Sequence, residues 1–189
     1  EVNAWLLKEP VSFKFAIPSS KLAYNIVAAA AVAYLYGFKA DQIQEGLDAY
    51  RPTGNRLNIT LLKDGGILIN DTYNANPVSR AAALETGREL AGNSRFVAVL
   101  GDMYELGDYE REGHQAVGAK AAQVAVDLLV AIGEKGRIIA EEAQKQGLPP
   151  EQVYHFPVKE GSIDFLRSQV SKQDVVLFKA SRGLQLETL

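Results

Sequence analysis

The chain has 189 residues, of which 47% are apolar and 23% are charged, a balance typical of a globular protein with room for one domain and part of another. A formal net charge of −3 without a basic stripe predicts no binding to nucleic acid or to an anionic membrane, and the lack of cysteine excludes disulfides and thiolate metal sites. The most apolar stretch, residues 26–36, is shorter than the roughly 20 residues that span a bilayer. With no signal-peptide pattern at residues 1–4, we expect a cytoplasmic protein without membrane insertion.

The first segment combines a strand with a long helix. Residues 1–17 alternate between polar and apolar side chains, which predicts a half-buried strand. An alanine-rich run predicts a helix over residues 21–36, with Ser19 or Ser20 as its N-cap. Gly37 stands where a helix commonly ends in a left-handed residue.

A second helix and a break follow. The apolar spacing predicts a helix over residues 40–50. The next five residues, Arg-Pro-Thr-Gly-Asn, are typical of turns. We therefore predict a boundary between one domain at residues 1–52 and a second at residues 53–189.

Strands and helices alternate in the second domain. A hairpin is predicted from residues 57–62 and 67–69, which flank Asp-Gly-Gly. Further strands are predicted at residues 96–100, 128–132, 153–156 and 175–178. Helices are predicted at residues 77–91, 109–124, 135–146 and 163–170. Apolar strands between amphipathic helices indicate an α/β fold, in which helices cover both faces of a mostly parallel, Rossmann-like sheet.

Polar residues gather after the second strand of the hairpin. Ligands of open parallel sheets bind beyond the carboxyl ends of the strands, so Asp71, Tyr73 and Asn74 are candidate binding residues. Asn76 before Pro77 suits a helix N-cap with proline in the first turn. Turns also favour Asn and Asp, so a structural and a ligand-binding interpretation both stay open.

Two later strand ends carry charged residues. Asp102 and Glu105 follow the strand at 96–100 and would suit an amine, a cation or a solvated loop. Lys179, Ser181 and Arg182 follow the last strand, and a lysine with an arginine suits a carboxylate or a phosphate. A solvated basic turn is the alternative.

Other site types find little support. Arg56 and His114 are weaker candidates, and with His155 as the only other histidine we predict no metal site. The glycines form neither a dinucleotide-binding fingerprint nor a phosphate-binding loop.

Five motifs in this order resemble the Mur ligase family in its D-alanyl-D-alanine-adding (MurF) type. Residues 71–77 (DTYNANP) resemble its D-S-Y-N-A-N-P, and residues 99–107 (VLGDMYELG) its V-L-G-D-M-x-E-L-G. Residues 179–184 (KASRGL) resemble its K-G-S-R-G-M, and residues 52–57 (PTGNRL) its P-x-x-G-R-L. Asn25 and the alanines after it are similar to the end of its H-N-x-x-N-A-x-A-A helix.

The resemblance implies a protein of three domains, for a UDP-sugar, for ATP hydrolysis, and a Rossmann-like C-terminal domain. Residues 1–52 are similar to the tail of the central ATP-binding domain, and residues 53–189 to the whole C-terminal domain. The family uses ATP and Mg²⁺ to activate the carboxylate of UDP-MurNAc-tripeptide as an acyl phosphate, which D-Ala-D-Ala attacks. The phosphate loop, the Mg²⁺ ligands and the rest of the N-terminal and central domains would precede residue 1, so we expect this chain to be inactive by itself.

The resemblance also implies roles toward ATP. It places Asn25 near the adenine, Arg56 near the phosphates and Asp71 near the ribose. Lys21 and Leu22 replace the family's His-Asn, so the adenine contact of that helix departs from the family pattern.

The remaining matches concern the acceptor and the cleft between domains. The resemblance lines the interdomain cleft with Tyr73, Asn74 and Asn76. It gives the acceptor to Asp102, Lys179, Ser181 and Arg182. No catalytic residue is assigned.

Two alternatives stay open. One is a related ligase, of another Mur type or similar to folylpolyglutamate synthase, although those carry a D-Y-A-H-x-P-like motif where residues 73–77 stand. The other is a non-catalytic binding domain that keeps the ligase scaffold.

Overall fold

The structure is a computed structural model that describes residues 1–6, 9–15, 20–52 and 54–189. The chain divides into two compact units, Glu1–Arg51 and Pro52–Leu189, and each is described by itself. None of the described helices has the length and apolar character that a membrane crossing requires.

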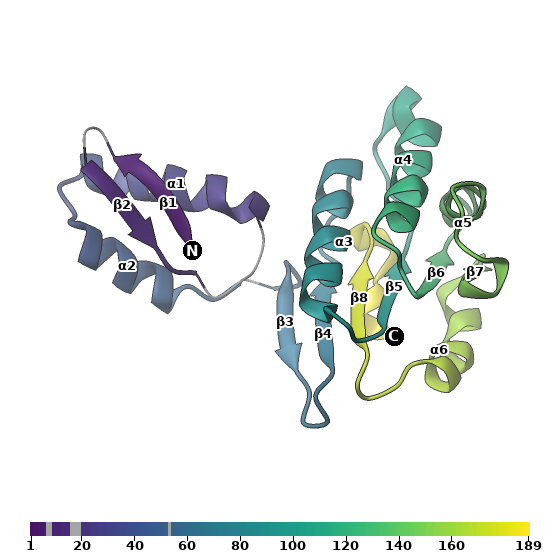
Figure 1. The fold of residues 1–189 in the computed structure, drawn as a ribbon. Coiled ribbons are helices and arrows are strands. Elements are labelled where there is room, and N and C mark those ends of the chain that lie inside the picture. Colours follow the sequence, from purple (N-terminus) through teal and green to yellow (C-terminus); the bar gives the residue numbers. More distant parts are fainter. Residues whose placement is uncertain (7–8, 16–19, 53) are drawn as a thin grey trace. The chain divides into compact units, whose positions relative to one another are not determined.

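The first unit pairs a hairpin with two helices (Figure 1). Strand β1 (Val2–Leu6) runs antiparallel to β2 (Glu9–Phe13). The prediction of one strand over residues 1–17 is therefore wrong for its described part, which forms two strands. Alternation is the same in both arms of a hairpin, so the pattern does not show where the chain reverses.

The helices of this unit close a small core. Helix α1 (Ser20–Leu35) and helix α2 (Ala40–Ala49) confirm the two predicted helices to within one residue. Gly37, at φ +91°, takes the left-handed conformation expected after α1. Ser20 is the first residue of α1 rather than its cap, and Ser19 lies outside the described residues. Among the described residues of the unit, the buried ones are Leu6, Phe13, Ile26, Ala30 and Ile43.

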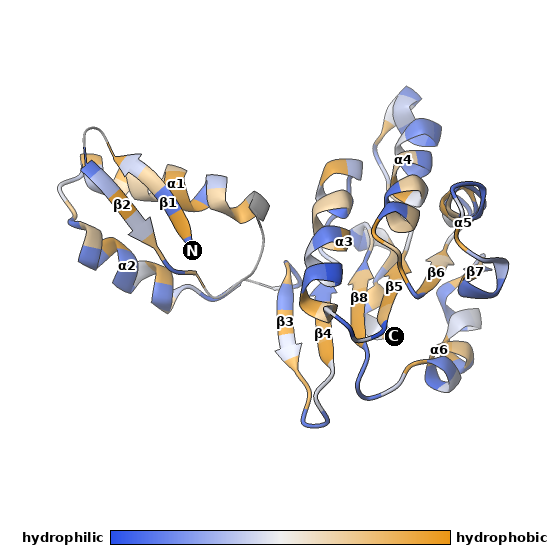
Figure 2. Ribbon diagram, viewed as in Figure 1, coloured by the Kyte–Doolittle hydropathy of each residue, from blue (hydrophilic) through white to orange (hydrophobic). Residues whose placement is uncertain are grey.

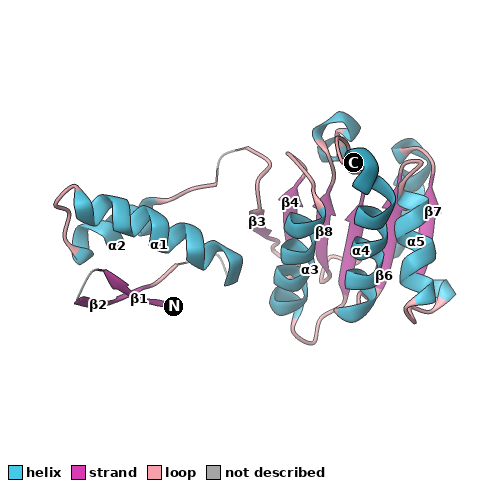
Figure 3. Cartoon of the chain, turned by 90° about the horizontal axis from the view of Figure 1, so that it is seen from above, coloured by secondary structure: helices cyan, strands magenta, loops and turns pink. Residues whose placement is uncertain are grey.

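The second unit is built on a six-stranded sheet in the order β3-β4-β8-β5-β6-β7 (Figures 1 and 3). The strands are β3 (Asn58–Leu61), β4 (Ile67–Asp71), β5 (Phe96–Leu100), β6 (Leu128–Ile132), β7 (Val153–Phe156) and β8 (Val175–Lys179). Only the edge strand β3 is antiparallel to its neighbour; the other pairings are parallel. The predicted mostly parallel sheet is confirmed.

Helices cover both faces of this sheet. The helices are α3 (Pro77–Ala91), α4 (Glu110–Gln123), α5 (Gly136–Lys145) and α6 (Ile163–Gln169). Short 3₁₀ turns lie at Gly107–Tyr109, Pro150–Gln152, Lys159–Ser162, Arg182–Leu184 and Leu186–Thr188. Helices α3, α4 and α5 lie side by side on one face (Figure 3), while α6 and the C-terminal turns pack on the other.

Strand β5 shows how the sheet is buried on both sides. In β5, Phe96 and Ala98 face the helices α3 to α5, whereas Val97 and Val99 face α6 and the C-terminal turns. The strands therefore form continuous apolar runs, largely orange in Figure 2, whereas the helices that cover them mix hydrophobic and hydrophilic residues. This order brings the carboxyl ends of β4, β8 and β5 next to one another.

Candidate functional site

Three adjacent strand ends carry the candidate residues of the second unit. Asp71 pairs in register with Lys179, and Lys179 pairs with Leu100 on its other side. Residues that follow β4, β8 and β5 therefore share one edge of the sheet, as expected for a ligand site of an open parallel sheet. We call this edge the strand-end rim.

A buried ion pair lies at the centre of the strand-end rim. Lys179 is only 2% exposed, and its Nζ donates to Asp71 Oδ2 at 2.5 Å and to the backbone oxygen of Asn74 at 3.1 Å. The second carboxylate oxygen of Asp71 accepts from the Leu57 amide at 3.1 Å. Burial lowers the pKa of Lys179, while the Asp71 charge opposes this shift. Asp71 and Lys179 thus bind each other in this structure.

Two exposed arginines lie against one aromatic ring of the rim. The guanidinium carbon of Arg56 is 4.1 Å from the centroid of Tyr73, and that of Arg182 is 5.5 Å from it. All three side chains are exposed, and no described carboxylate forms an ion pair with either arginine. Cations held by a ring face without a counter-ion are available to an anionic ligand.

Asp102 is turned away from the exposed part of the rim. It is 5% exposed, and its Oδ1 accepts from the Gly136 amide at the start of α5 at 2.7 Å. Gly133 packs against the carboxylate so closely that a Cβ there would overlap with it. Burial raises the pKa of Asp102, and the amide of Gly136 opposes the shift. The geometry shows Asp102 holding α5, and its assignment to the acceptor stays a prediction.

Ser181 links the loops that follow β5 and β8. Its hydroxyl accepts from the Tyr104 amide at 3.1 Å, and its amide donates to the Asp102 backbone oxygen at 3.2 Å. It is 6% exposed, so its side chain is used within the protein.

Asn74 and Asn76, which follow β4, support local structure. Asn76 is the N-cap of α3, where its side chain accepts from the Ser79 amide at 2.8 Å, as the Asn-Pro pair indicated. The side chain of Asn74 accepts from the Ala75 amide at 2.8 Å, although the residue remains exposed.

Two buried helix residues contact the rim, although no sequence pattern singled out Arg80 and His114 was only a weak candidate. Arg80 in α3 is fully buried and donates to the backbone oxygens of Gly101 and Asp102. His114 accepts from the Met103 amide at 3.1 Å through Nε2, so its other nitrogen donates to the Glu110 carbonyl at 2.7 Å. An arginine and a histidine in an amphipathic helix normally face solvent, and no sequence signal marked these two as buried.

The last predicted residue, Asn25, belongs to the first unit. Asn25 lies exposed on α1 of the first unit. Within the described ranges, no group of three or more His, Asp or Glu is arranged to hold a metal ion.

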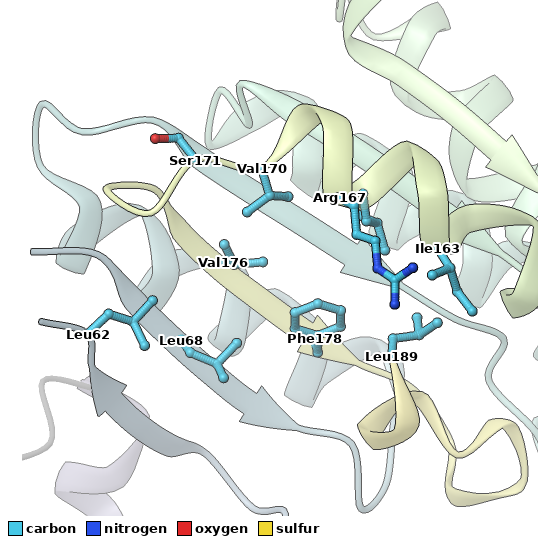
Figure 4. A pocket seen from close by; sticks show the side chains of 10 residues that line it. Leu62, Leu68, Ile163, Arg167, Val170, Ser171, Val176, Phe178 and Leu189 are labelled. Carbon is cyan, nitrogen blue, oxygen red and sulfur yellow. The ribbon is translucent and has the colours of Figure 1, made fainter. Parts of the chain in front are cut away.

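A separate apolar pocket of about 300 Å³ lies on the α6 face of the sheet (Figure 4). It is lined by residues of β4, β8 and α6 with their flanking segments: Leu62, Leu68, Ile163, Leu166, Arg167, Val170, Ser171, Val176, Phe178 and Leu189. Arg167 is the single charged residue among them, so the pocket offers little that would orient a polar substrate. The strand-end rim remains the candidate site.

Comparisons with known proteins identify relatives of this chain. Residues 55–182 match the family model described as Mur ligase, glutamate ligase domain. The UDP-N-acetylmuramoyl-tripeptide–D-alanyl-D-alanine ligase of Bacillus subtilis (strain 168) is 36% identical over 165 residues, which cover 87% of this chain and 36% of that protein. A crystal structure of MurF from Acinetobacter baumannii matches with a TM-score of 0.81 and 27% identity, over 96% of this chain and 39% of the other. The MurF ligase from Thermotoga maritima in complex with ADP matches with a TM-score of 0.75 and 25% identity, over 95% of this chain and 39% of the other.

The chain spans little more than a third of the length of these relatives, so it corresponds to one part of longer proteins. The family model nevertheless covers most of the second unit, including the rim from Arg56 to Arg182. The chain therefore belongs to the Mur ligase family, with its glutamate ligase domain at residues 55–182.

Proposed function

We propose that this chain is part of an ATP-dependent ligase that adds D-alanyl-D-alanine to a UDP-MurNAc-tripeptide during the synthesis of peptidoglycan precursors in the cytoplasm. The observation that carries the proposal is its 36% identity, along 87% of its length, to a ligase named for this reaction. The strand-end rim supports it, because the family motifs at residues 71–77, 99–107 and 179–184 converge there.

The proposed reaction has two steps. A carboxylate oxygen of the tripeptide attacks the γ-phosphorus of ATP, which forms an acyl phosphate and releases ADP. The amine nitrogen of D-Ala-D-Ala then attacks the acyl carbon, loses a proton and releases phosphate. Both steps depend on positioning and on compensation of negative charge.

The exposed cations of the rim suit that second requirement. Arg56 would face the phosphates and Arg182 the carboxylate of the acceptor, and their shared contact with Tyr73 would bring the two anionic groups close together. A guanidinium can donate two parallel hydrogen bonds to either group. Tyr73, Asn74 and Asn76 would border the cleft toward the rest of the full-length protein.

The buried polar residues would act less directly. The pairing of Asp71 with Lys179 means that a ribose hydroxyl at Asp71, or a carboxylate at Lys179, would have to share a group already engaged. Ser181 and Asp102 would shape the acceptor side through the loops that they hold. Asn25 would contribute to the adenine side from the first unit.

The family reaction also uses Mg²⁺. The described residues offer no cluster of three carboxylate or imidazole groups, and we expect the Mg²⁺ ligands mainly in another part of the full-length protein.

The decisive experiment uses the full-length protein with ATP, Mg²⁺ and UDP-MurNAc-tripeptide. We expect phosphate release that depends on D-Ala-D-Ala, and none from the 189-residue chain alone. Equal release with single amino acids or with glutamate would favour another ligase of the family. No release with any acceptor would favour a binding domain on the ligase scaffold.

A further inference from the structure

Arg80, in the first turns of α3, is a fully buried cation that the proposed reaction does not use. Its exposed fraction is 0%, and its Nη2 donates to the backbone oxygens of Gly101 and Asp102, the second at 3.1 Å. Among the residues that the structure describes, none accepts a hydrogen bond from Nε or Nη1.

If Arg80 served only to stabilise the fold, its burial would be unfavourable. A buried guanidinium loses its hydration, and here it is bonded to two carbonyl groups rather than to a carboxylate. Burial lowers the pKa of Arg80 to about 9, with the charges of Asp102 and Asp71 opposing the shift, so the side chain still carries its charge at neutral pH. An apolar side chain of similar volume would fill the same space without desolvation of a charge.

The two carbonyl groups are the first ones beyond β5, where backbone hydrogen bonds link the end of β5 to the end of β8. The Gly101 amide donates to the Lys179 oxygen at 3.0 Å, and the Asp102 oxygen that Arg80 contacts also accepts from the Ser181 amide at 3.2 Å. Arg80 and the Ser181 amide thus donate to the same Asp102 oxygen, and Ser181 is the residue directly before Arg182.

We propose that Arg80 is a positioning residue: it fixes the Gly101 and Asp102 carbonyl groups, and through them the Ser181 backbone, so that Arg182 stays beside Tyr73. The local part of this claim stands independently of the proposed function. Its consequence for catalysis rests on the proposed function.

A matched pair of variants separates positioning from general support of the fold. Arg80→Met removes the hydrogen bonds at the rim while it keeps an apolar side chain of similar length. Arg88→Met removes an arginine from the far end of the same helix, where Arg88 pairs with Asp127 at 3.0 Å. Both are made in the 189-residue chain and compared by amide hydrogen exchange.

We expect the Ser181 amide of Arg80→Met to exchange about tenfold faster relative to the amide of Leu129 in the buried strand β6, an effect of the size that a lost hydrogen bond produces. Arg88→Met should leave this ratio unchanged even where it lowers the Tm. An unchanged ratio in Arg80→Met, or an equal change in Arg88→Met, overturns the positioning role.

A lysine variant covers the case in which Arg80→Met fails to fold. Lys can donate to the same two carbonyl groups, so Arg80→Lys should keep part of the protection of the Ser181 amide from exchange. A tenfold rise of the Ser181-to-Leu129 exchange ratio in Arg80→Lys overturns the proposal. In the full-length enzyme, Arg80→Lys should raise the acceptor KM or lower kcat and leave the ATP KM nearly constant. If the wild-type enzyme shows no D-Ala-D-Ala-dependent turnover, the proposed function fails, while the exchange ratio still decides the local claim.

Discussion

Lys179 Nζ lies 2.5 Å from Asp71 Oδ2, and these two side chains neutralise each other at the centre of the strand-end rim. Because they come from neighbouring strands in register, the sheet itself sets their separation. The exposed positive charge of the rim therefore comes from Arg56 and Arg182, which lie against Tyr73.

Removal of one partner of the buried pair should destabilise the protein strongly. Lys179→Met leaves the Asp71 carboxylate without its counter-ion, and we expect a loss of about 3 kcal/mol in the free energy of unfolding. Arg137→Met, which removes the exposed pair with Glu141, should cost less than about 0.5 kcal/mol. Urea denaturation of the second unit measures both. Equal losses in the two variants would show that the Lys179 pair contributes no more than a surface pair.

The strands of the second unit were predictable because burial on two faces leaves a distinctive pattern. The runs at residues 96–100 and 128–132 are apolar at every position, and polar or glycine-containing segments bound them. Each predicted strand and helix of this unit is present in the structure within two residues of its expected bounds. The convergence of the strand-end motifs followed from the parallel topology, since parallel strands share a carboxyl edge.

The direction of individual side chains was beyond the reach of the sequence. Asp102 stands at a strand end, where a ligand role was expected, yet its partner is the amide of Gly136, 34 residues away. Arg80 occupies a helix position that would be solvated in most folds, and the packing of α3 against α4 and the sheet buries it. Such partners depend on tertiary contacts that local patterns do not encode.

Loss of the Arg182 charge should affect the acceptor more than ATP. In the full-length enzyme, we expect Arg182→Ala to raise the KM for D-Ala-D-Ala tenfold or more, as removal of charge-assisted hydrogen bonds does. The KM for ATP should change less, because Arg56 remains. Steady-state kinetics with each substrate varied in turn measures the split. A larger effect on ATP would move Arg182 to the phosphate side of the site.

The ring of Tyr73 should matter less than the arginines that it holds. An exposed cation–π contact is worth about 0.5–1 kcal/mol, so Tyr73→Leu should raise the acceptor KM by about two- to fivefold. Tyr73→Phe keeps the ring and should stay near the wild-type value. A Phe variant as impaired as the Leu variant would point to the hydroxyl group, rather than the ring face, as the functional element.

Gly133 should tolerate no side chain, for two reasons that a control can separate. It has φ +101°, and a Cβ at this position would overlap with the Asp102 carboxylate. Gly147 has φ +106°, but no heavy atom lies within 4 Å of the place that a Cβ would take, so Gly147→Ala measures the backbone strain alone. We expect Gly133→Ala to cost at least about 2 kcal/mol more than Gly147→Ala in urea denaturation. Similar losses of unfolding free energy in the two variants would mean that the Asp102 side chain moves away from the new Cβ at little cost.

Acid should destabilise the second unit through His114. Burial lowers the pKa of this histidine below its ordinary value of 6.5, and the nearby Arg80 adds to the shift, whereas Asp102 and Glu110 oppose it. The unfolded chain then binds the proton more tightly than the folded protein. The contribution of neutral His114 to the free energy of unfolding is therefore fully present above pH 6.5. It falls as the pH drops through this value and levels off below the lowered pKa.

The two histidines of the chain allow this effect to be assigned. His114→Gln should flatten the decline of the unfolding free energy below pH 6.5, whatever its effect on stability at neutral pH. His155→Gln removes a histidine of β7 whose ring contacts the Gly133 carbonyl at 2.8 Å, and the decline should persist in this variant. Urea denaturation between about pH 5 and 8 gives the slopes. A decline that survives unchanged in His114→Gln would show that a group other than His114 carries the acid sensitivity.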